Sequence, residues 1–516
     1  MRKELKISLI HYNTELSKGE LPPLGLLYLA SYLKKNGFSN VYVVDLMLEE
    51  NQEKALTNYL KQLDRNDNNL IGYYMNTHTR FEVQKSIKLT RKILPDSIIC
   101  SGGPHPTLSR ESTLLNCYEL DFVVVGEGEE TLLYVVQTLS VDFNLSSIKN
   151  ILGVSLKLEE EIIHNDLRPR IKNLDDIPFP DRDLININDY KFSFPIVNRN
   201  LQKSIVTTSI ITSRGCPYSC IFCSVADQWG RLNTCNTPEK VVEEIKLLNI
   251  KYGINGFYFF DDTFTLNKKR VKEICDRIID EKLNIYWFCE IRANTVDEQI
   301  LTLMYKAGLR SVAMAVESGS PRILKEVVKK GITLDQAKRV VEICKKLEIY
   351  IKVFFTYSYP EETLNDVMLT LNYLKNLNPD RVIIGQIRVY PGTPVFRYAL
   401  EKKILPDDFD WFNRDASYNS VSNESCIPLF IDKLTFRDFL FINREIDRIK
   451  RELANDLNNK ALDLNRVKNF IIREKGNLVN DLKRIHDIKD IRVVINKYSF
   501  KFKQIFYKLF KIKRLH

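Results

Sequence analysis

The first part of the chain alternates short runs of β-branched and aromatic residues with longer amphipathic stretches. Strands separated by helices predict βαβ units and a parallel, doubly wound sheet. One amphipathic stretch, Leu26–Lys35, follows Pro22 and Pro23 and predicts a helix that ends at Gly37. We therefore expect an α/β domain over residues 1–145, with strands in five apolar runs: Ile7–Ile10, Val41–Val44, Leu70–Tyr74, Ser97–Cys100 and Phe122–Val125.

The same alternation returns after a proline-broken segment. Residues 146–200 include Pro178 and Pro180, and because a residue before proline favours extended geometry, we interpret this segment as a linker. Six βα units then fill residues 201–400 and predict a partial (β/α)6 barrel, while helical patterns follow in residues 401–516. The expected barrel strands are Ser209–Thr212, Gly256–Phe260, Ile285–Cys289, Val312–Val316, Ile351–Phe355 and Arg381–Gly385.

The composition is that of a globular protein with several domains. At 516 residues the chain is too long for one ordinary domain, and 44% hydrophobic with 28% charged residues is typical of proteins that fold in water. No apolar run reaches the ~18 residues of a membrane span, and the N-terminus has no secretory-signal pattern. Ten cysteines without a regular framework favour a reducing interior over a disulfide scaffold, so we expect a cytoplasmic protein.

The net charge of +10 is concentrated at the C-terminus. Residues 491–516 contain eight Lys or Arg and no Asp or Glu, and the rest of the chain has 68 basic against 66 acidic residues. Global charge therefore gives no case for a nucleic-acid partner. The tail is also aromatic, with Phe502, Phe506 and Phe510 on one face of a helix. Two interpretations stay open: peripheral contact with an anionic membrane, or a helix packed on the core.

Three cysteines form the most informative motif of the chain. Cys216, Cys220 and Cys223 have C-x3-C-x2-C spacing just after an expected strand. Thiolates on one short loop are ligands of iron–sulfur clusters, and three of them leave one iron of a 4Fe-4S cluster open to another ligand. The alternatives are inert cysteines or a zinc site, but zinc needs a fourth ligand and Cys235 is the only nearby candidate.

These residues resemble the radical S-adenosylmethionine (SAM) family, in which the residue before the last cysteine is usually aromatic, as Phe222 is here. The resemblance implies that SAM binds the open iron and is cleaved reductively to a 5'-deoxyadenosyl radical. It also implies an external electron donor of the flavodoxin or ferredoxin type. The cysteines would then follow the first strand of the partial barrel.

Polar residues follow the expected barrel strands, where active sites of such barrels lie. Carboxylates suit the SAM ammonium and sulfonium, an arginine can pair with its carboxylate, and Glu or Ser can bind ribose hydroxyls. The alternative is that these side chains simply cap loops. The resemblance to radical SAM enzymes implies SAM contacts at Asp261, Asp262, Arg292, Glu317 and Ser318.

Two glycine loops follow expected strands of the N-terminal domain, and glycine lets a backbone approach a ligand closely. Their order resembles the cobalamin-binding domain that precedes many radical SAM cores, which implies a flavodoxin-like fold that holds the corrin ring. The D-x-H-x-x-G signature is absent, and we interpret His11, His78 and His105 as hydrogen-bonding loop residues rather than cobalt ligands. The residues implied at the cobalamin site are Gly102, Gly103, His105, Gly126, Glu127 and Gly128.

Together the two resemblances imply a cobalamin-dependent radical SAM enzyme that methylates an unactivated carbon of a small-molecule, lipid or peptide substrate. Hydrogen abstraction itself requires no acid or base from the protein. One alternative is a radical cyclase of the anaerobic magnesium-protoporphyrin ester cyclase type. A methylthiotransferase is disfavoured because only Cys100 and Cys117 precede Cys216. The non-enzyme alternative is a cobalamin or redox sensor.

Overall fold

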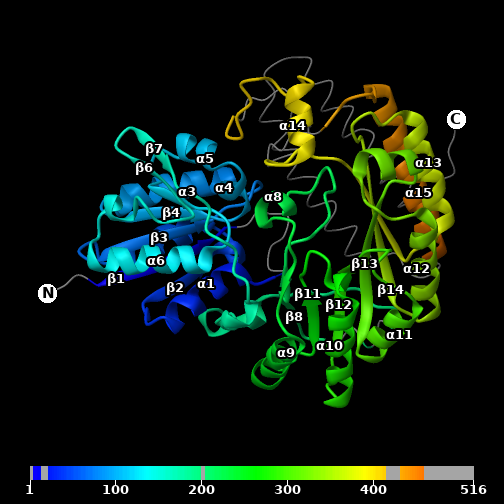
Figure 1. Cartoon of the computed structure of the whole chain (residues 1–516), viewed down its shortest axis with the longest axis horizontal. Helices are drawn as coiled ribbons and strands as arrows, with labels where there is room; N and C mark the ends of the chain where they lie inside the picture. Colours follow the sequence, from blue (N-terminus) through cyan, green and yellow to red (C-terminus); the bar gives the residue numbers. More distant parts are fainter. Residues whose placement is uncertain (1–3, 13–20, 199–200, 202–203, 414–429, 458–516) are drawn as a thin grey trace, which may run out of the picture. The chain divides into compact units, whose positions relative to one another are not determined.

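A computed structural model describes residues 4–12, 21–198, 201, 204–413 and 430–457 of the chain. Two predominantly parallel sheets organise these residues, one in the N-terminal part and one in the central part (Figure 1). The predicted α/β class, with a doubly wound sheet followed by a partial barrel, is confirmed. Residues 414–429 and 458–516, including the basic tail, lie outside the described residues.

The first sheet has seven strands in the order β2-β1-β3-β4-β5-β6-β7. Its first five strands pair in parallel, and their order 2-1-3-4-5 is that of the flavodoxin-like fold. All five predicted strands are present, with ends shifted by up to two residues. They are β1 (Leu5–His11), β2 (Val41–Asp45), β3 (Asn68–Tyr74), β4 (Ile98–Gly102) and β5 (Phe122–Val124).

Helices cover both faces of this sheet. On one face Leu9 packs with Leu33 and Val136, and on the other Ile10 packs with Leu60 and Ile87. Burial on both faces explains why the strands read as nearly continuous apolar runs. The helices are α1 (Leu24–Lys35), α2 (Gln52–Gln62), α3 (Arg80–Ile93), α4 (Pro104–Leu108), α5 (Arg110–Asn116) and α6 (Gly128–Val141).

An antiparallel hairpin extends the sheet into the segment interpreted as a linker. Strand β6 (Val154–Leu158) pairs with β5 and with β7 (Glu161–His164). The linker predicted at 146–200 is therefore too long at its start, because its first part belongs to the N-terminal sheet. The two strands are short and joined by a charged turn at Glu159, so their sequence carries a weak strand pattern.

The second sheet has six parallel strands in the order β15-β14-β13-β12-β11-β8. Each strand pairs with its neighbour in the chain, and β8 and β15 lie at opposite edges, so the sheet is the expected open barrel. The strands are β8 (Thr207–Ile210), β11 (Gly256–Phe259), β12 (Tyr286–Ile291), β13 (Leu309–Glu317), β14 (Tyr350–Tyr357) and β15 (Arg381–Gln386).

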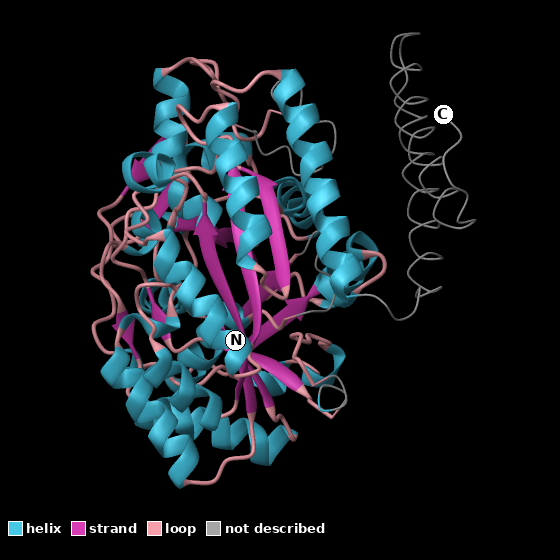
Figure 2. Ribbon diagram, turned by 90° about the vertical axis from the view of Figure 1, so that its right-hand side faces the viewer, coloured by secondary structure: helices cyan, strands magenta, loops and turns pink. Residues whose placement is uncertain are grey.

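Helices flank the strands of the barrel (Figure 2). In β14 the residues Ile351, Val353 and Phe355 are buried, while Lys352 and Phe354, which alternate with them, are partly exposed. This alternation indicates a covered outer face and an accessible inner face. The helices are α9 (Pro238–Tyr252), α10 (Lys268–Asp280), α11 (Glu298–Lys306), α12 (Leu334–Lys346), α13 (Leu364–Leu377) and α14 (Pro394–Glu401), with α15 (Phe436–Leu457) further along.

Part of the linker packs against the barrel strands. The ring of Phe192 stacks on Tyr258 at a centroid distance of 5.4 Å, and that of Phe194 stacks on Phe288 at 6.1 Å. Tyr258 and Phe288 are register partners in β11 and β12, on the same face of the sheet as Ala313. We call these four rings the aromatic floor.

The chain returns to the N-terminal domain after α14. Trp411 and Phe412 are buried against the core of that domain, where the Phe412 ring meets Phe81 edge-on at 6.2 Å. The buried Arg80 donates from Nε to the Trp411 carbonyl at 2.6 Å. The segment after the barrel is therefore part of the N-terminal core.

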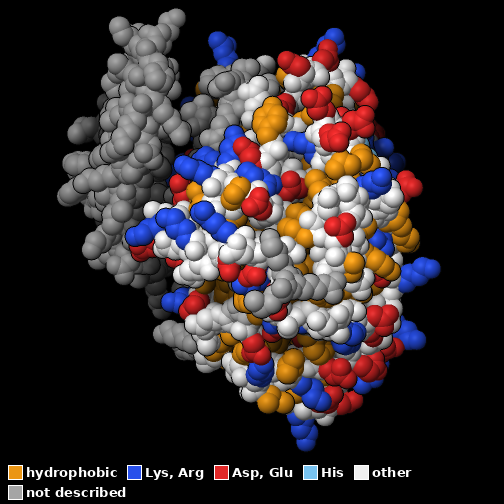
Figure 3. Space-filling view, turned by 90° about the vertical axis from the view of Figure 1, so that its left-hand side faces the viewer, with side chains coloured by type: hydrophobic (Ala, Val, Ile, Leu, Met, Phe, Trp, Pro, Cys, Tyr) orange, Lys and Arg blue, Asp and Glu red, His pale blue; other side chains and the backbone are white. Residues whose placement is uncertain are grey.

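The described surface carries charges of both signs. On the face shown in Figure 3, basic, acidic and hydrophobic side chains are interspersed. This pattern agrees with a nearly neutral body and gives no broad basic field for nucleic acid on that face. Among the described helices none is long and apolar enough to cross a membrane.

Gly308 provides a test of the barrel geometry. It follows α11 with φ +104°, and a Cβ there would collide with the Ile285 carbonyl oxygen at the start of β12. We expect Gly308→Ala to lower the free energy of unfolding by about 1–3 kcal/mol from backbone strain alone. Gly385→Ala is the matched control, since a Cβ there meets nothing within 4 Å. Equal denaturation midpoints for the two variants would contradict this geometry.

Candidate functional site

The three cysteines lie on a loop that a small β-ribbon closes. After β8, strand β9 (Ser213–Arg214) pairs antiparallel with β10 (Thr234–Cys235), and the cysteines lie between these strands. We call residues 213–223 the cluster loop; α8 (Val225–Trp229) follows it directly. Cys220 is buried, whereas Cys216 and Cys223 are partly exposed.

The donor set of the loop fits an iron–sulfur cluster better than a single ion. Within the described part of the chain, no three His, Cys, Asp or Glu side chains are grouped so that they could hold one metal ion. A 4Fe-4S cluster takes one thiolate per iron, so its thiolates need not converge on one point. Cys235, the fourth ligand that a zinc site would need, donates from Sγ to Asn233 Oδ1 at 2.9 Å.

Two adjacent aspartates at the end of β11 hold the base of the cluster loop. Asp261 accepts from the Thr212 backbone N–H at 2.7 Å and from the hydroxyls of Thr212 and Ser213 at 2.6 and 2.7 Å. Asp262 accepts from the Gly215 N–H at 3.0 Å, and burial raises the pKa of its carboxyl. Because the buried Asp261 carboxylate is occupied by the loop, the geometry favours a positioning role over the predicted SAM contact.

The end of β13 carries a buried polar group next to the cluster loop. Glu317, at φ +78°, forms an ion pair with Lys330 at 2.8 Å and accepts from Tyr359 Oη at 3.2 Å. Lys330 Nζ lies 6.0 Å from the Phe222 ring centroid, and the Tyr359 ring lies 6.1 Å from it. The structure thus brings the predicted Phe222 and Glu317 to one side of the loop.

Arg292 and Ser318 face different surroundings. The Arg292 guanidinium stacks on the Tyr218 ring of the cluster loop, 3.4 Å from its centroid, and donates to the Lys330 carbonyl. Ser318 is fully buried and its hydroxyl lies 3.1 Å from Thr370 Oγ1, so it is turned into the fold. Sequence reasoning missed Lys330, because a lysine in a loop after a barrel strand carries no periodic signal.

The partly exposed face of β12 and β14 adds further polar groups. Glu290 accepts from Tyr258 Oη at 3.1 Å, and burial raises the pKa of its carboxyl. The Lys352 ammonium lies 5.4 Å from the Phe288 ring centroid. Carboxyl, ammonium and phenol groups therefore stand beside the aromatic floor.

A cavity of about 510 Å³ lies where the N-terminal sheet meets α8. Gly126, after β5, has φ +80° and would have no atom within 4 Å of a Cβ, so its backbone is open to this cavity. Gly103 differs, because a Cβ there would lie 2.7 Å from the Met75 carbonyl. The cavity is lined by Thr107, Arg110, Val125, Gly126, Glu127, Glu130, residues 167–171 and residues 226–230.

Comparison with known proteins identifies two domains of the chain. Residues 210–374 match the model of the radical SAM superfamily, and residues 11–136 match that of the B12 binding domain. An uncharacterized methyltransferase of Pyrococcus horikoshii is 35% identical over 384 residues, covering 74% of this chain and 80% of the relative. The chain belongs to the cobalamin-binding radical SAM family. Its cofactors are accordingly a 4Fe-4S cluster, SAM and cobalamin.

A curated enzyme and a solved structure are also similar to this chain. The anaerobic magnesium-protoporphyrin IX monomethyl ester cyclase of Rubrivivax gelatinosus is 26% identical, covering 79% of this chain and 72% of the cyclase. The radical SAM methyltransferase TsrM of Kitasatospora setae, solved with cobalamin and a 4Fe-4S cluster, superimposes with a TM-score of 0.63 at 19% identity, covering 78% of this chain and 75% of TsrM. At this level of identity, the similarity to TsrM shows a shared fold.

Three histidines in the described N-terminal domain of this family member make hydrogen bonds inside the protein. His11 pairs with Asp45 at 2.9 Å, and His78 lies 3.1 Å from Tyr390 Oη. His105 is fully buried against Trp411 and Phe412, and burial lowers its pKa to about 3. Because no surface of His105 is exposed, the structure is at odds with its predicted place at the cobalamin site.

Neighbouring side chains lie close to some of the glycines in the turns of the cobalamin-binding domain. A Cβ at Gly128 would lie 3.0 Å from Leu29, whereas one at Gly102 would meet Val124 at an ordinary 3.7 Å. The Glu127 carboxylate binds Arg214 of the cluster loop. Of the predicted glycine residues, Gly126 therefore has the most open backbone, and the others stay predictions.

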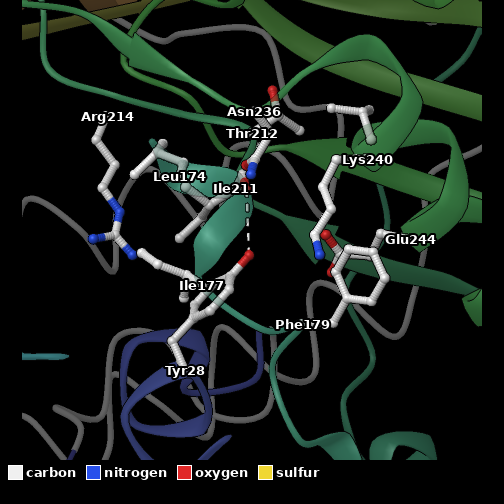
Figure 4. Close-up of a pocket in the computed structure, with 11 residues that line it drawn as sticks. Tyr28, Leu174, Ile177, Phe179, Ile211, Thr212, Arg214, Asn236, Lys240 and Glu244 are labelled. Atoms are coloured by element: carbon white, nitrogen blue, oxygen red, sulfur yellow. Dashed lines mark hydrogen bonds between the residues drawn. The ribbon is translucent and has the colours of Figure 1, made fainter. Parts of the chain in front are cut away.

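Both this domain and the linker contact the barrel of the radical SAM protein near β8. Tyr28 donates to the Ile211 carbonyl at 3.3 Å across a cavity of about 10 Å³ (Figure 4), roughly the room one water needs. Beside it the buried Arg182 pairs with Glu244 at 2.8 Å and donates to the Ser209 carbonyl at 2.8 Å. The linker thus contacts β8 just before the cluster loop.

Asp261→Asn tests the support of the cluster loop. A hydrogen bond to a charged group contributes about 1.5–3 kcal/mol, and an amide keeps only one acceptor oxygen. We therefore expect the variant to bind less iron on anaerobic reconstitution and to lose it faster to a chelator. The control is Asp276→Asn on the surface of α10. Iron retention equal to wild type in Asp261→Asn would contradict the positioning role.

Proposed function

We propose that this enzyme transfers a methyl group from SAM, by way of cobalamin, to an unactivated carbon of a small molecule. The observation that carries the proposal is the cavity of about 510 Å³, which is bounded by Gly126 of the cobalamin-binding domain and by α8 immediately after Cys223. Cobalamin bound in this cavity would lie next to the cluster loop, so a substrate inside the barrel would meet both cofactors. Similarity to a methyltransferase over most of the chain supports the same reaction.

The residues of the chain hold the cofactors in this proposal. Cys216, Cys220 and Cys223 bind the cluster, and Asp261 with Asp262 fixes the loop that carries them. When bound, the cluster reduces and cleaves SAM, and cobalamin carries the methyl group. Arg292, stacked on Tyr218 beside the cluster loop, is a candidate partner for the SAM carboxylate.

The partly exposed wall of the barrel supports a small-molecule substrate. Glu290 and Lys352 offer opposite charges beside the aromatic floor, so polar and apolar parts of a ligand would each find a partner. An external flavodoxin or ferredoxin would supply the electron. Lipid and peptide substrates remain alternatives that the product analysis below distinguishes.

Labelled SAM tests the reaction. Protein reconstituted with iron, sulfide and cobalamin, reduced anaerobically and given methyl-13C SAM with a metabolite extract, should form 5'-deoxyadenosine and a product that carries the label. The Cys216→Ala, Cys220→Ala, Cys223→Ala triple variant should form neither. Mass spectrometry of the product separates the alternatives. Turnover with no label in any product would favour cyclisation, and no SAM turnover would favour a sensor.

The basic tail, outside the described residues, suggests a peripheral membrane contact. Each Lys or Arg near an anionic leaflet contributes about 1 kcal/mol, attenuated over a Debye length of ~8 Å. With eight such residues and no acidic ones in 491–516, full-length protein should float with anionic vesicles, less with neutral ones and less in high salt. Equal flotation of a variant lacking 491–516 would rule this contact out, and a lowered melting temperature would favour a packed helix.

A further inference from the structure

Arg214, two residues before Cys216, reaches out of the barrel into the cobalamin-binding domain. Its Nη1 pairs with Glu127 at 3.0 Å and its Nη2 with Glu129 at 2.6 Å. The Arg214 side chain is 11% exposed and both glutamate side chains are 6% exposed, so solvent screens these ion pairs little. We call these three residues the Arg214 clamp.

The two glutamates belong to the turn that borders the large cavity. Glu127 precedes α6, follows the open Gly126 and lines that cavity, and Glu129 lies in the first turn of the helix. The second oxygen of Glu127 accepts from the Ile171 N–H at 2.7 Å. The acidic side of the clamp is thus fixed to the wall of the cobalamin domain.

The basic side of the clamp is fixed to the cluster loop. Arg214 pairs with Thr234 in the β-ribbon, and its carbonyl accepts from Arg170 Nη2 at 3.2 Å. The next residue, Gly215, donates to Asp262 at 3.0 Å and accepts from Asn233 Nδ2 at 2.7 Å. A displacement of Arg214 would therefore move the backbone that leads into Cys216.

Other contacts between the domains accompany the clamp, and one of them, between α4 and α8, also lies beside the cluster loop. Among ion pairs between described residues, those that join the N-terminal sheet domain to the barrel all use Arg214. The bond from Tyr28 is a single one at 3.3 Å, and Trp411 packs on the opposite, α3-side core of the N-terminal domain. The clamp therefore joins the wall of the cobalamin domain to the cluster loop directly.

We propose that Arg214 is a positioning residue that sets the separation and orientation of the cluster relative to cobalamin. A planar guanidinium that binds two carboxylates at the start of one helix fixes direction as well as distance, which an ammonium does not. Transfer chemistry between two cofactors depends on such geometry, since small misplacements of reacting groups reduce rates strongly. This inference rests on the two cofactors of the family and is independent of which substrate is methylated.

Three variants separate positioning from simple stabilisation. Arg214→Met combined with Glu127→Gln and Glu129→Gln removes the clamp without leaving buried unpaired charge. Arg214→Lys keeps the charge and loses the planar fork. Arg91→Met combined with Asp121→Asn is the matched control, because it removes a partly buried Arg–Asp pair inside the N-terminal domain and touches neither the linker nor the clamp.

The readout is the distance between the two cofactors. Protein loaded with cluster and cob(II)alamin is frozen and cryoreduced, so that both centres are paramagnetic, and pulsed dipolar EPR gives the distribution of their separations. We expect a broadened distribution in the triple variant, an intermediate one in Arg214→Lys, and the wild-type distribution in the control despite its lower melting temperature.

These measurements test the positioning role of Arg214 and do not require the substrate to be known. Broadening in the clamp variants with iron and cobalamin contents near those of wild type supports positioning. A distribution as narrow as wild type in Arg214→Lys overturns it, even if the triple variant fails to fold or loses a cofactor, because Arg214 would then only stabilise the protein. A failed methylation assay with broadened distances would count against the proposed reaction and not against the clamp.

Discussion

The carboxylates of Asp261 and Asp262 continue the hydrogen bonding of β8 and β11 where the strands themselves stop. β8 ends at Ile210, and beyond it the chain must leave the sheet to form the cluster loop. Backbone N–H groups buried without partners would make that departure costly. The two aspartates, at the end of the neighbouring strand, accept from Thr212 and Gly215 and so allow the loop to begin in a fixed place.

The remaining contacts of the site extend this anchor in two directions. On one side, Arg292 stacks on Tyr218 and Lys330 lies beside Phe222, so side chains from β12 and from the segment after β13 flank the cysteines. On the other side, Arg214 carries the same rigid loop to the cobalamin-binding domain. The cluster loop is thus held by contacts to both domains, although all of its residues precede β11, the second strand of the barrel.

The sequence predicts the scaffold better than the contacts. Runs of β-branched and aromatic residues located both parallel sheets, and the signal was plainest in the first, whose strands are buried on both faces. The hairpin β6–β7 was missed because two short strands around a charged turn carry little pattern. The resemblance to the family also pointed to Asp261 and Glu127. It did not reveal their partners, because Glu127 bonds Arg214 across 87 positions of the chain.

The aromatic floor combines two rings from barrel strands with two from the linker. Phe192 and Phe194 are held by the linker, whereas the cysteines and the aspartates of the cluster loop belong to the barrel itself. A larger or smaller side chain at either linker position would change the room above Tyr258 and Phe288 and leave every strand untouched. Under the proposed function, substitutions in a connecting segment would therefore alter the substrate space without altering the loop that holds the cluster.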